Sequence, residues 1–385
     1  MITDGFTYLT VLILIASSVV YIEKRSQYKL FEYLPAIVII YFTVMVLSTI
    51  GLWEKSDSIN TTYKTLKSNL LPTMIFLMLL SADMREIFKL GSKMLFTFVL
   101  ASFSIAVGFI GSFALFHTYF DAEAWKAFAA LSGSWMGGTA NMVAIQGALN
   151  IPDSAMGYTL LIDSVDYAIW VMLLLGLVPF AYKFNLWSRS DTSIIDEVGA
   201  RLEAKERAKE PIDFASLFLL LGISLLVSSF SQYISEFLPI TSFVTTTTWI
   251  VIISTLLGII FAMTPIAKIS GSSEIAFIML YLIVVLIASR ANLAELTQAP
   301  LYIFAGFVIL FIHLILMLIF AKLFKLDLFT IGIASLANIG GVASAPILAS
   351  AYSKALIPIG VLMAMLGYII GTFGGLMVGK VLEGF

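Results

Sequence analysis

Residues 132–149 read SGSWMGGTANMVAIQGAL, and this stretch decides the fold class. Inside a longer apolar segment it contains the adjacent pair Gly137-Gly138, surrounded by small and amide side chains. Paired glycine permits a helix to break, and the freed backbone groups then need polar partners. A second stretch, residues 337–352, reads ANIGGVASAPILASAY and contains Gly340-Gly341. We therefore expect one interrupted helix at each pair, although glycines spaced by four, such as Gly133 and Gly137, also suit close helix packing.

The composition around these stretches is that of a membrane protein. Of 385 residues, 60% are hydrophobic and 12% are charged, and the charged share is about half of that usual in soluble domains. A membrane-spanning helix needs roughly 20 apolar residues, so the chain has room for about ten to twelve spans. The apolar segments are 6–22, 30–52, 69–87, 92–118, 124–149, 156–184, 213–237, 243–263, 273–292, 301–324, 328–352 and 357–382. The predicted class is an all-α polytopic protein of the bacterial inner membrane, in direct contact with the lipid bilayer.

The same composition excludes several classes of function. The chain has no cysteine and two histidines, so thiol chemistry and polyhistidine metal centres are excluded and no cofactor is expected. A net charge of −2 without a basic face argues against nucleic acid as a partner. No phosphate-binding loop is present, which argues against transport driven directly by ATP.

Two halves of similar organisation flank a polar linker. Six apolar segments occupy residues 1–184, six occupy residues 213–385, and residues 185–212 between them are highly charged. At an offset of 203 residues the first Gly-Gly stretch aligns with the second, and a match at an offset of 209 precedes it in both halves. The halves are therefore predicted to be repeats arising from a duplication.

The distribution of Lys and Arg favours inverted repeats. If every segment crosses the membrane, the 22 basic residues divide 14 to 8 between the two sides. If segments 124–149 and 328–352 instead enter and leave on one face, they divide 16 to 6. The positive-inside rule prefers the second arrangement, with a cytoplasmic linker. Lys55, Lys64 and Lys67 then share one outer loop, and crossing but broken helices remain the alternative.

The interrupted helices are predicted to form the solute site. Broken helices at corresponding places in two halves are typical of transporter sites at mid-membrane. Free N–H groups at a half-helix N-terminus suit an organic anion, and unwound carbonyls suit a cation. The candidate substrate-binding residues are Ser134, Gly137, Gly138, Thr139, Asn141, Gln146, Asn338, Gly340, Gly341 and Ser344.

The next segment contains two acids in an apolar run, LIDSVDYAIW. Spacings of three and four place Asp163, Asp166 and Tyr167 on one helix face. Carboxylates at mid-membrane usually face a polar cavity and handle protons or ions. The equivalent stretch of the second half, 360–371, has no acid, which favours a functional role over an architectural one. We expect these three residues to couple transport to H⁺ or Na⁺, and the sequence does not choose between the two ions.

At SGSWMGGTANMVAIQGAL, the span with the two acids, and ANIGGVASAPILASAY, the chain resembles the YjcL-like family of uncharacterised bacterial integral membrane proteins. That family is placed in the broad group of cation/proton antiporters, bile-acid sodium symporters and glutamate or citrate symporters. The resemblance covers essentially the whole chain. It implies inverted repeats, a core domain that moves against a scaffold domain, and elevator-type alternating access. It implies roles for both Gly-Gly pairs, Asn141, Ser344, Asp163 and Asp166. The citrate-symporter branch has a further glycine shortly after its Gly-Gly pair, whereas this chain has Ala140 and Ala343 at those positions. The resemblance therefore does not decide whether the two pairs form hairpin tips.

These observations predict a secondary active transporter of a small organic anion, coupled to protons or sodium. An intramembrane aspartyl enzyme is disfavoured because such enzymes bring their acids from two helices, so no enzymatic activity is expected. A passive channel is the other alternative, disfavoured because no filter motif is present. By analogy with transporters of this type, a homodimer is the expected assembly.

Overall fold

The computed structural model describes residues 1–25, 36–82, 87–190, 211–241, 244–293, 299–353 and 356–385. Within these ranges the protein is helical, and the only bridge between extended residues joins Ile2 and Trp53. The α-helices are α1 (Gly5–Arg25), α3 (Ala36–Thr49), α4 (Asp57–Leu80), α6 (Ser92–Phe116), α7 (Ala124–Gly137), α8 (Thr139–Ala148), α9 (Met156–Leu177), α10 (Ala181–Ser188), α12 (Phe214–Ser235), α13 (Thr246–Ala262), α14 (Ser272–Ala288), α15 (Ala299–Phe324), α16 (Leu328–Ile339), α17 (Gly341–Tyr352) and α18 (Ile357–Leu382).

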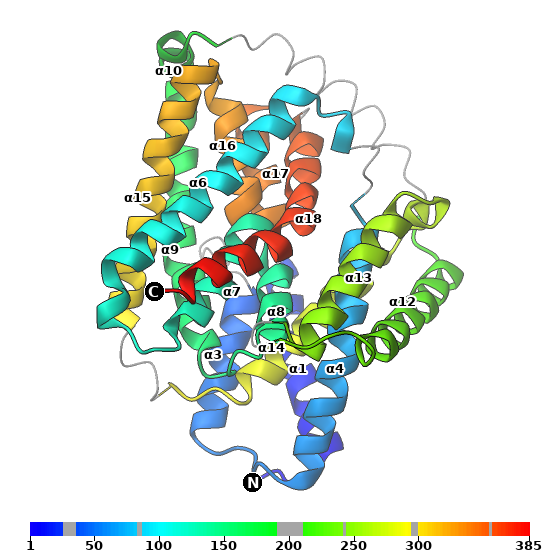
Figure 1. Ribbon diagram of the computed structural model, residues 1–385. Helices are drawn as coiled ribbons and strands as arrows, with labels where there is room; N and C mark the ends of the chain where they lie inside the picture. Colours follow the sequence, from blue (N-terminus) through cyan, green and yellow to red (C-terminus); the bar gives the residue numbers. More distant parts are fainter. Residues whose placement is uncertain (26–35, 83–86, 191–210, 242–243, 294–298, 354–355) are drawn as a thin grey trace.

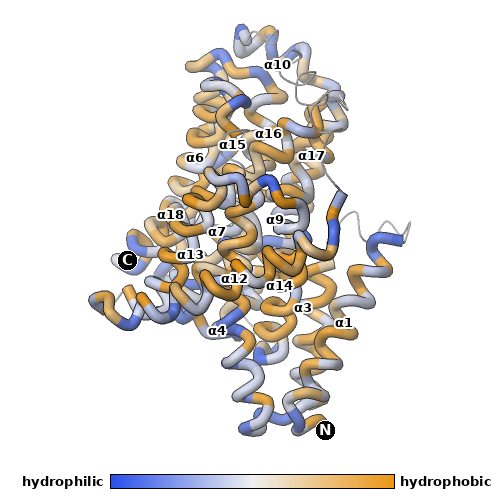
Figure 2. The backbone as a smooth tube through the Cα atoms, turned by 90° about the vertical axis from the view of Figure 1, so that its right-hand side faces the viewer, coloured by the Kyte–Doolittle hydropathy of each residue, from blue (hydrophilic) through white to orange (hydrophobic). Residues whose placement is uncertain are grey.

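Six of the described helical stretches are long and apolar enough to cross a membrane. They are Gly5–Arg25, Ser92–Tyr119, Met156–Ser188, Phe214–Ser235, Ala299–Phe324 and Ile357–Leu382. Figure 2 shows hydrophobic residues along most of the helices, with hydrophilic residues concentrated near the N-terminus and around α10. The prediction of an all-helical membrane protein is confirmed for the described residues by the length and composition of these helices.

Several helices begin where a polar side chain satisfies the first free N–H groups. The Asp213 carboxylate accepts from Ala215 N and Ser216 N at the start of α12. Asp327, fully buried, accepts from Thr330 N at the start of α16 and forms an ion pair of 2.8 Å with Lys93 at the start of α6. Such caps each stabilise a helix start by about 1 kcal/mol. The ion pair also joins the entry points of two helices that are far apart in sequence.

The buried side chains form two hydrophobic clusters. One contains residues of α6, α7, α9, α15, α16, α17 and α18, and the other contains residues of α1, α3, α4, α8, α12, α13 and α14. Each cluster therefore combines helices from both halves of the chain. In Figure 1 the helices of the second cluster occupy the lower and right-hand parts, and α6, α9 and α15 stand together on the left.

Two consecutive helices fold back on one another at each Gly-Gly pair. In α7–α8, a Cβ added to Gly133 would lie 3.4 Å from the Asn141 carbonyl oxygen and would also meet Ile145. In α16–α17, the rings of Phe329 and Tyr352 have centroids 5.2 Å apart. A continuous helix would separate residues twelve or more positions apart by about 18 Å or more. We call α7–α8 the first hairpin and α16–α17 the second hairpin. The alternative of a crossing, broken helix does not describe this geometry.

Two of the differences between the observed bounds and the apolar segments concern the border between a polar region and a helix. The segment predicted at 69–87 belongs to α4, which begins at Asp57 because Ser56 Oγ accepts from Ile59 N. At the predicted linker, α10 extends to Ser188. Residues 191–210, which make up most of that linker, lie outside the described residues.

Candidate functional site

The two hairpin tips meet. The backbone at Gly138, between α7 and α8, has φ 90°, and Gly341 at the start of α17 has φ 59°. Both values lie in the left-handed region, where a side chain is strained and glycine is favoured. A Cβ added to Gly341 would lie 3.8 Å from the Cα atom of Gly138. Breaks about 200 residues apart in sequence thus lie so close that a single added methyl group would bring them into van der Waals contact.

Two helix N-termini begin at this contact. Helix α8 starts at Thr139 and α17 starts at Gly341, and neither start has a side chain hydrogen-bonded to it as a cap. Gly138, Thr139 and Gly340 are each partly exposed. Uncapped N–H groups at a helix start attract negative charge, so the tips have the chemistry of an anion site.

Asp163 of α9 is bound to the first hairpin immediately before its break. Its Oδ1 accepts from Trp135 Nε1 at 2.9 Å and from Ser134 Oγ at 3.3 Å. Asp163 is partly exposed, whereas Ser134 and Trp135 are buried. The structure therefore brings Ser134, a predicted substrate residue, and Asp163, a predicted coupling residue, into direct contact.

Asp166 faces a different neighbour. Its side chain is fully buried, and within the described part of the chain neither carboxylate oxygen has a hydrogen-bond partner. A Cβ on Gly306 of α15 would overlap Asp166 Oδ2, so this glycine provides the space that the carboxylate occupies. A buried, unpaired carboxylate ion costs several kcal/mol or more. Gly306 therefore leaves room for the Asp166 carboxylate, and no described residue donates a hydrogen bond that would stabilise its charge.

A tyrosine stands beside each tip. A Cβ on Gly340 would lie 2.6 Å from Tyr167 Cε2 of α9 and would also meet Ser344 Oγ. A Cβ on Gly138 would lie 3.8 Å from Tyr368 Cε1 of α18. Tyr167 was among the predicted residues and Tyr368 was not. Each hairpin tip is therefore flanked by the helix that follows the other hairpin.

The two asparagines brace the hairpins against neighbouring helices. Asn141 donates to the Gly137 carbonyl at 2.7 Å, and its Oδ1 accepts from Thr372 Oγ1 of α18 at 2.6 Å. Asn338 donates to the Ala334 carbonyl at 2.8 Å, and its Oδ1 accepts from Ser102 Oγ of α6 at 2.7 Å. Both amides are buried. Their contacts hold the backbone near the tips in position.

Gln146 lies apart from the other predicted substrate residues. It sits near the end of α8, and its Nε2 donates to Asp153 Oδ1 at 2.7 Å in the loop before α9. Its position follows from the hairpin, which places the end of α8 away from the tip. The contact connects the hairpin to a polar cluster at its base.

A row of glycines on α18 escaped the prediction of site residues. Cβ atoms added to Gly367 and Gly371 would lie 2.9 and 2.8 Å from Gly137 Cα, and one on Gly375 would lie 2.9 Å from Gly133 Cα. One on Gly379 would lie 2.9 Å from Ala129 Cβ. Small residues at spacing four permit such close backbone contact. The spacing of four between these glycines could be read from the sequence. The sequence did not show that α7 is the helix against which they pack.

The described residues contain no group of three His, Asp or Glu side chains arranged to hold a metal ion. Oxygen atoms close to the tips include the Gly137 carbonyl, the Ser344 hydroxyl and the Asp163 carboxylate, which Ser134 and Trp135 bind just before the first break. Hard cations such as Na⁺ are held by oxygen ligands of this kind, in part by unwound backbone carbonyls.

Comparison with known proteins extends the resemblance seen in the sequence. The model of the family described as "Protein of unknown function (DUF819)" matches residues 10–385. The chain is also 26% identical over 357 residues to "Uncharacterized membrane protein YjcL" of Bacillus subtilis (strain 168), which covers 89% of this chain and 88% of that protein. The resemblance to the YjcL-like family is confirmed, and so is the prediction of a multi-pass membrane protein.

Proposed function

This chain belongs to the DUF819 family, a family of membrane proteins without an assigned activity, and we propose that it is a secondary active transporter of a small organic anion. Transport is coupled to H⁺ or Na⁺. The observation that carries the proposal is the meeting of the two hairpin tips beside the acids of α9. Two helix breaks directed at one point, with ionisable groups next to them, are the usual plan of a solute and coupling-ion site.

The solute binds between the tips in this proposal. The N-termini of α8 and α17 supply N–H groups and partial positive charge to a carboxylate of the solute. Tyr167 and Tyr368 lie on either side and close the site laterally. The proposed binding residues are the predicted residues that lie at the tips, among them Thr139 and Ser344.

Asp163 and Asp166 carry the coupling ion. No described residue donates a hydrogen bond to Asp166, and a proton or a cation removes the cost of its buried charge. Asp163 responds to the first hairpin because Trp135 and Ser134 bind it directly. A change in the occupancy of the acids therefore reaches the tip through these two hydrogen bonds.

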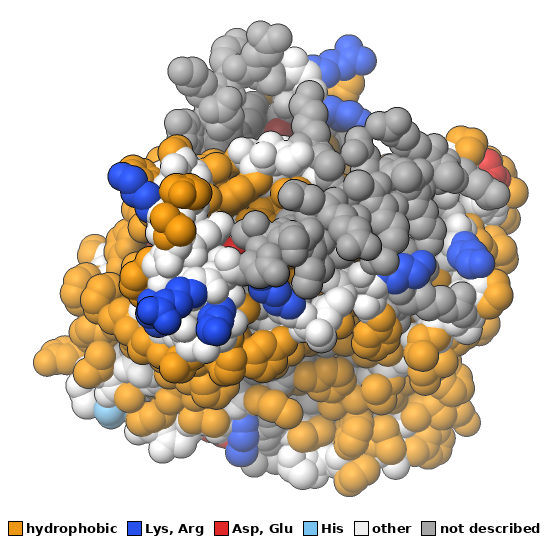
Figure 3. Space-filling view, turned by 90° about the horizontal axis from the view of Figure 1, so that it is seen from above, with side chains coloured by type: hydrophobic (Ala, Val, Ile, Leu, Met, Phe, Trp, Pro, Cys, Tyr) orange, Lys and Arg blue, Asp and Glu red, His pale blue; other side chains and the backbone are white. Residues whose placement is uncertain are grey.

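Alternating access follows an elevator-type motion. The two hairpins with α6, α9, α15 and α18 serve as the moving core, and α1, α3, α4 and α12–α14 serve as the scaffold. Helix α8 of the first hairpin packs in the same hydrophobic cluster as the scaffold helices and therefore lies at the boundary between the two parts. The parts of the chain in each cluster support two repeats, 1–184 and 213–385, because each repeat contributes its first helices to one cluster and most of its later helices to the other. Seen from above, the charged side chains on the face around the grey segment are mostly Lys and Arg (Figure 3), as the positive-inside rule expects of a cytoplasmic side.

No catalytic role is assigned. Asp163 and Asp166 come from one helix and face different neighbours, α7 and α15. An aspartyl enzyme needs two carboxylates that act on one water molecule. The same separation suits two groups that respond to different parts of a moving core.

Currents in proteoliposomes test the proposal. The purified protein is reconstituted, and charge movement is recorded on a supported membrane while succinate, citrate, glutamate and lactate are applied, with and without Na⁺ and at several pH values. We expect at least one acid to produce a saturable, ion-dependent current. Asp163→Asn and Asp166→Asn should each reduce the ratio of the current with the coupling ion to the current without it by about tenfold or more, because a neutral amide cannot exchange a proton or a cation.

Asp121→Asn is the control, since Asp121 is an exposed acid outside the helices. It should retain the wild-type current. Unchanged currents and ion dependence in both α9 variants would refute the coupling role. A current that does not saturate would instead indicate a channel.

A further inference from the structure

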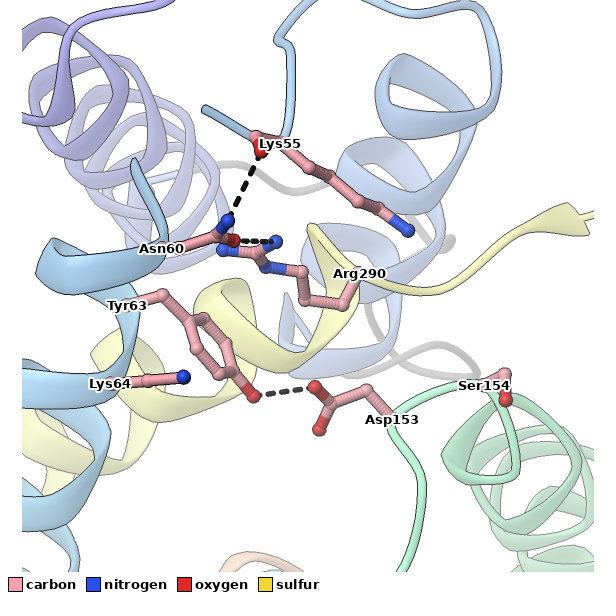
Figure 4. A pocket seen from close by; sticks show the side chains of 7 residues that line it. All are labelled: Lys55, Asn60, Tyr63, Lys64, Asp153, Ser154 and Arg290. Atoms are coloured by element: carbon pink, nitrogen blue, oxygen red, sulfur yellow. Dashed lines mark hydrogen bonds between the residues drawn. The ribbon is translucent and has the colours of Figure 1, made fainter. Parts of the chain in front are cut away.

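A second polar site lies at the base of the first hairpin. It is a pocket of about 340 Å³ lined by Lys55, Asn60, Tyr63, Lys64, Asp153, Ser154 and Arg290 (Figure 4). The walls come from α4 and the loop before it, from the loop between α8 and α9, and from the residue after the C-cap of α14. Its volume falls within the range of about 300–1,000 Å³ that is usual for small-molecule sites.

One carboxylate of the chain already sits in this pocket. Asp153 Oδ1 accepts from Lys67 Nζ at 2.8 Å and from Gln146 Nε2 at 2.7 Å, and Oδ2 accepts from the Tyr63 hydroxyl at 2.5 Å. Three donors from α4 and α8 thus converge on a single carboxylate group. Charge-assisted hydrogen bonds of this kind are the strong ones, so Asp153 and its three donors form a fixed wall beside the pocket.

One further donor in the pocket, a guanidinium nitrogen of Arg290, has no acceptor among the described residues. Arg290 Nη1 donates to Asn60 Oδ1 at 2.8 Å, and its guanidinium carbon lies 4.6 Å from the centre of the Tyr63 ring. These contacts hold the guanidinium in place. Its Nη2 is nevertheless buried, and no atom of the described residues accepts a well-formed hydrogen bond from it. An unmet buried donor of a charged group costs about 1–3 kcal/mol or more, and an incoming anion removes that cost.

The charge of the pocket is strongly positive. Lys55 and Lys64 are exposed, and neither forms an ion pair within the described residues. Together with Lys67 and Arg290 they oppose one acid, Asp153. Figure 4 shows Arg290, Tyr63 and Asp153 around a common space. Positive charge lining one concavity raises the local concentration of anions and the rate at which they bind.

The placement of these cations is unusual for a membrane protein. In the inverted topology only 6 of the 22 basic residues lie on the outer side, and Lys55, Lys64, Lys67 and Arg290 are four of them. The positive-inside rule disfavours basic residues there. Four of them nevertheless gather at or beside one pocket, from α4, its preceding loop and the end of α14. Membrane insertion does not account for this grouping, which favours a role in binding.

We propose that this pocket is an outer binding site for a small carboxylate anion, with Arg290 Nη2 and Lys64 Nζ as its principal donors. The inference rests on the proposed function for the identity of the anion as the transported solute. The pocket captures the anion before it reaches the hairpin tips. Asp153 links the two places, because Gln146 ties it to the hairpin that must move.

Titration calorimetry in detergent at low ionic strength tests the site, with succinate as the probe and sulfate as a competitor. We expect Arg290→Gln to weaken succinate binding about tenfold or more, since it removes charge-assisted hydrogen bonds. Lys64→Gln changes only an exposed side chain and should weaken binding about threefold at low salt, with less effect at high salt. If Arg290→Gln does not fold, succinate binding by Lys64→Gln still tests the pocket.

Lys126→Gln is the matched control, because Lys126 is another outer basic residue outside the pocket. It should bind succinate like the wild type. The pocket is refuted if both pocket variants bind succinate as the control does, if the wild type does not bind succinate, or if sulfate binds as tightly as succinate. Loss of succinate binding in the pocket variants would support the outer site. If the wild-type protein at the same time gave no ion-driven current, the transporter proposal would be refuted and the outer site would stand.

Discussion

The indole N–H of Trp135 lies 2.9 Å from Oδ1 of Asp163. This bond joins the last turn of α7, next to the break at Gly138, to an acid in the middle of α9. It makes Asp163 part of the first hairpin's support as well as an ionisable group. Any change in the charge of Asp163 must strengthen or weaken that support.

Removing this donor should alter ion dependence. We expect Trp135→Phe to destabilise the charged form of Asp163 by about 1.5–3 kcal/mol, the usual worth of a hydrogen bond to a charged group. The pH or Na⁺ dependence of the proteoliposome current should shift accordingly. Trp170→Phe is the matched control: it removes a buried indole that donates to a neutral group, Ser335 Oγ, at 2.9 Å. Equal shifts in the two variants would show that the Asp163 bond has no special role.

The space for Asp166 is provided by Gly306, and this relationship can be tested by stability. Gly306→Ala should lower thermal stability, because the new Cβ overlaps Asp166 Oδ2 and overpacking costs about 1–3 kcal/mol. The double variant Gly306→Ala with Asp166→Ala should recover most of the loss, since the smaller side chain frees the space. Unfolding followed by tryptophan fluorescence measures both. Strictly additive effects would contradict direct contact.

The glycine row of α18 should be intolerant of a single methyl group. Gly375→Ala places a Cβ 2.9 Å from the backbone of Gly133, and backbone cannot yield as a side chain can. We expect a loss of about 1–3 kcal/mol. Gly222→Ala in α12 has nothing within 4 Å of the new Cβ and should be neutral or stabilising by about 0.5–1 kcal/mol. Thermal unfolding of the two variants in one detergent makes the comparison, and equal midpoints would argue against the close packing of α7 and α18.

The hairpins predict an access pattern for labelling. The natural chain has no cysteine, so single cysteines can be introduced and probed with a membrane-impermeant maleimide in whole cells. Glu123→Cys and Pro152→Cys, at the two ends of the first hairpin, should both react from outside. Lys325→Cys and Ser350→Cys, at the ends of the second, should react only after permeabilisation. All four positions are exposed.

Labelling of Glu123→Cys and Pro152→Cys from opposite sides would contradict a hairpin that enters and leaves on one face. Equal outside labelling of all four positions would contradict inverted repeats. Either result would leave the packing of the tips unchanged and would require a different placement of the molecule in the membrane.

The sequence by itself determined the membrane class, the helical fold and the positions of both breaks. These follow from local causes: apolar runs without charge must be helical in lipid, and paired glycines at Gly137-Gly138 and Gly340-Gly341 remove the side chains that would oppose a break. The expectation that Asp163 and Asp166 couple an ion is also a local inference, because a carboxylate in an apolar run is costly wherever its helix packs, and it stays a prediction.

Only the tertiary structure decided what these features contact. It brought Gly138 against Gly341, turned Asp163 towards Trp135 and Asp166 towards Gly306, and placed Tyr368 beside a break 230 residues earlier in the chain. It also moved Gln146 away from the tips and gathered Arg290 with the lysines of α4 and its preceding loop. Helical periodicity gives the face of a residue on its own helix, but the neighbour on that face depends on how distant helices pack, and spacing along the chain does not encode that packing.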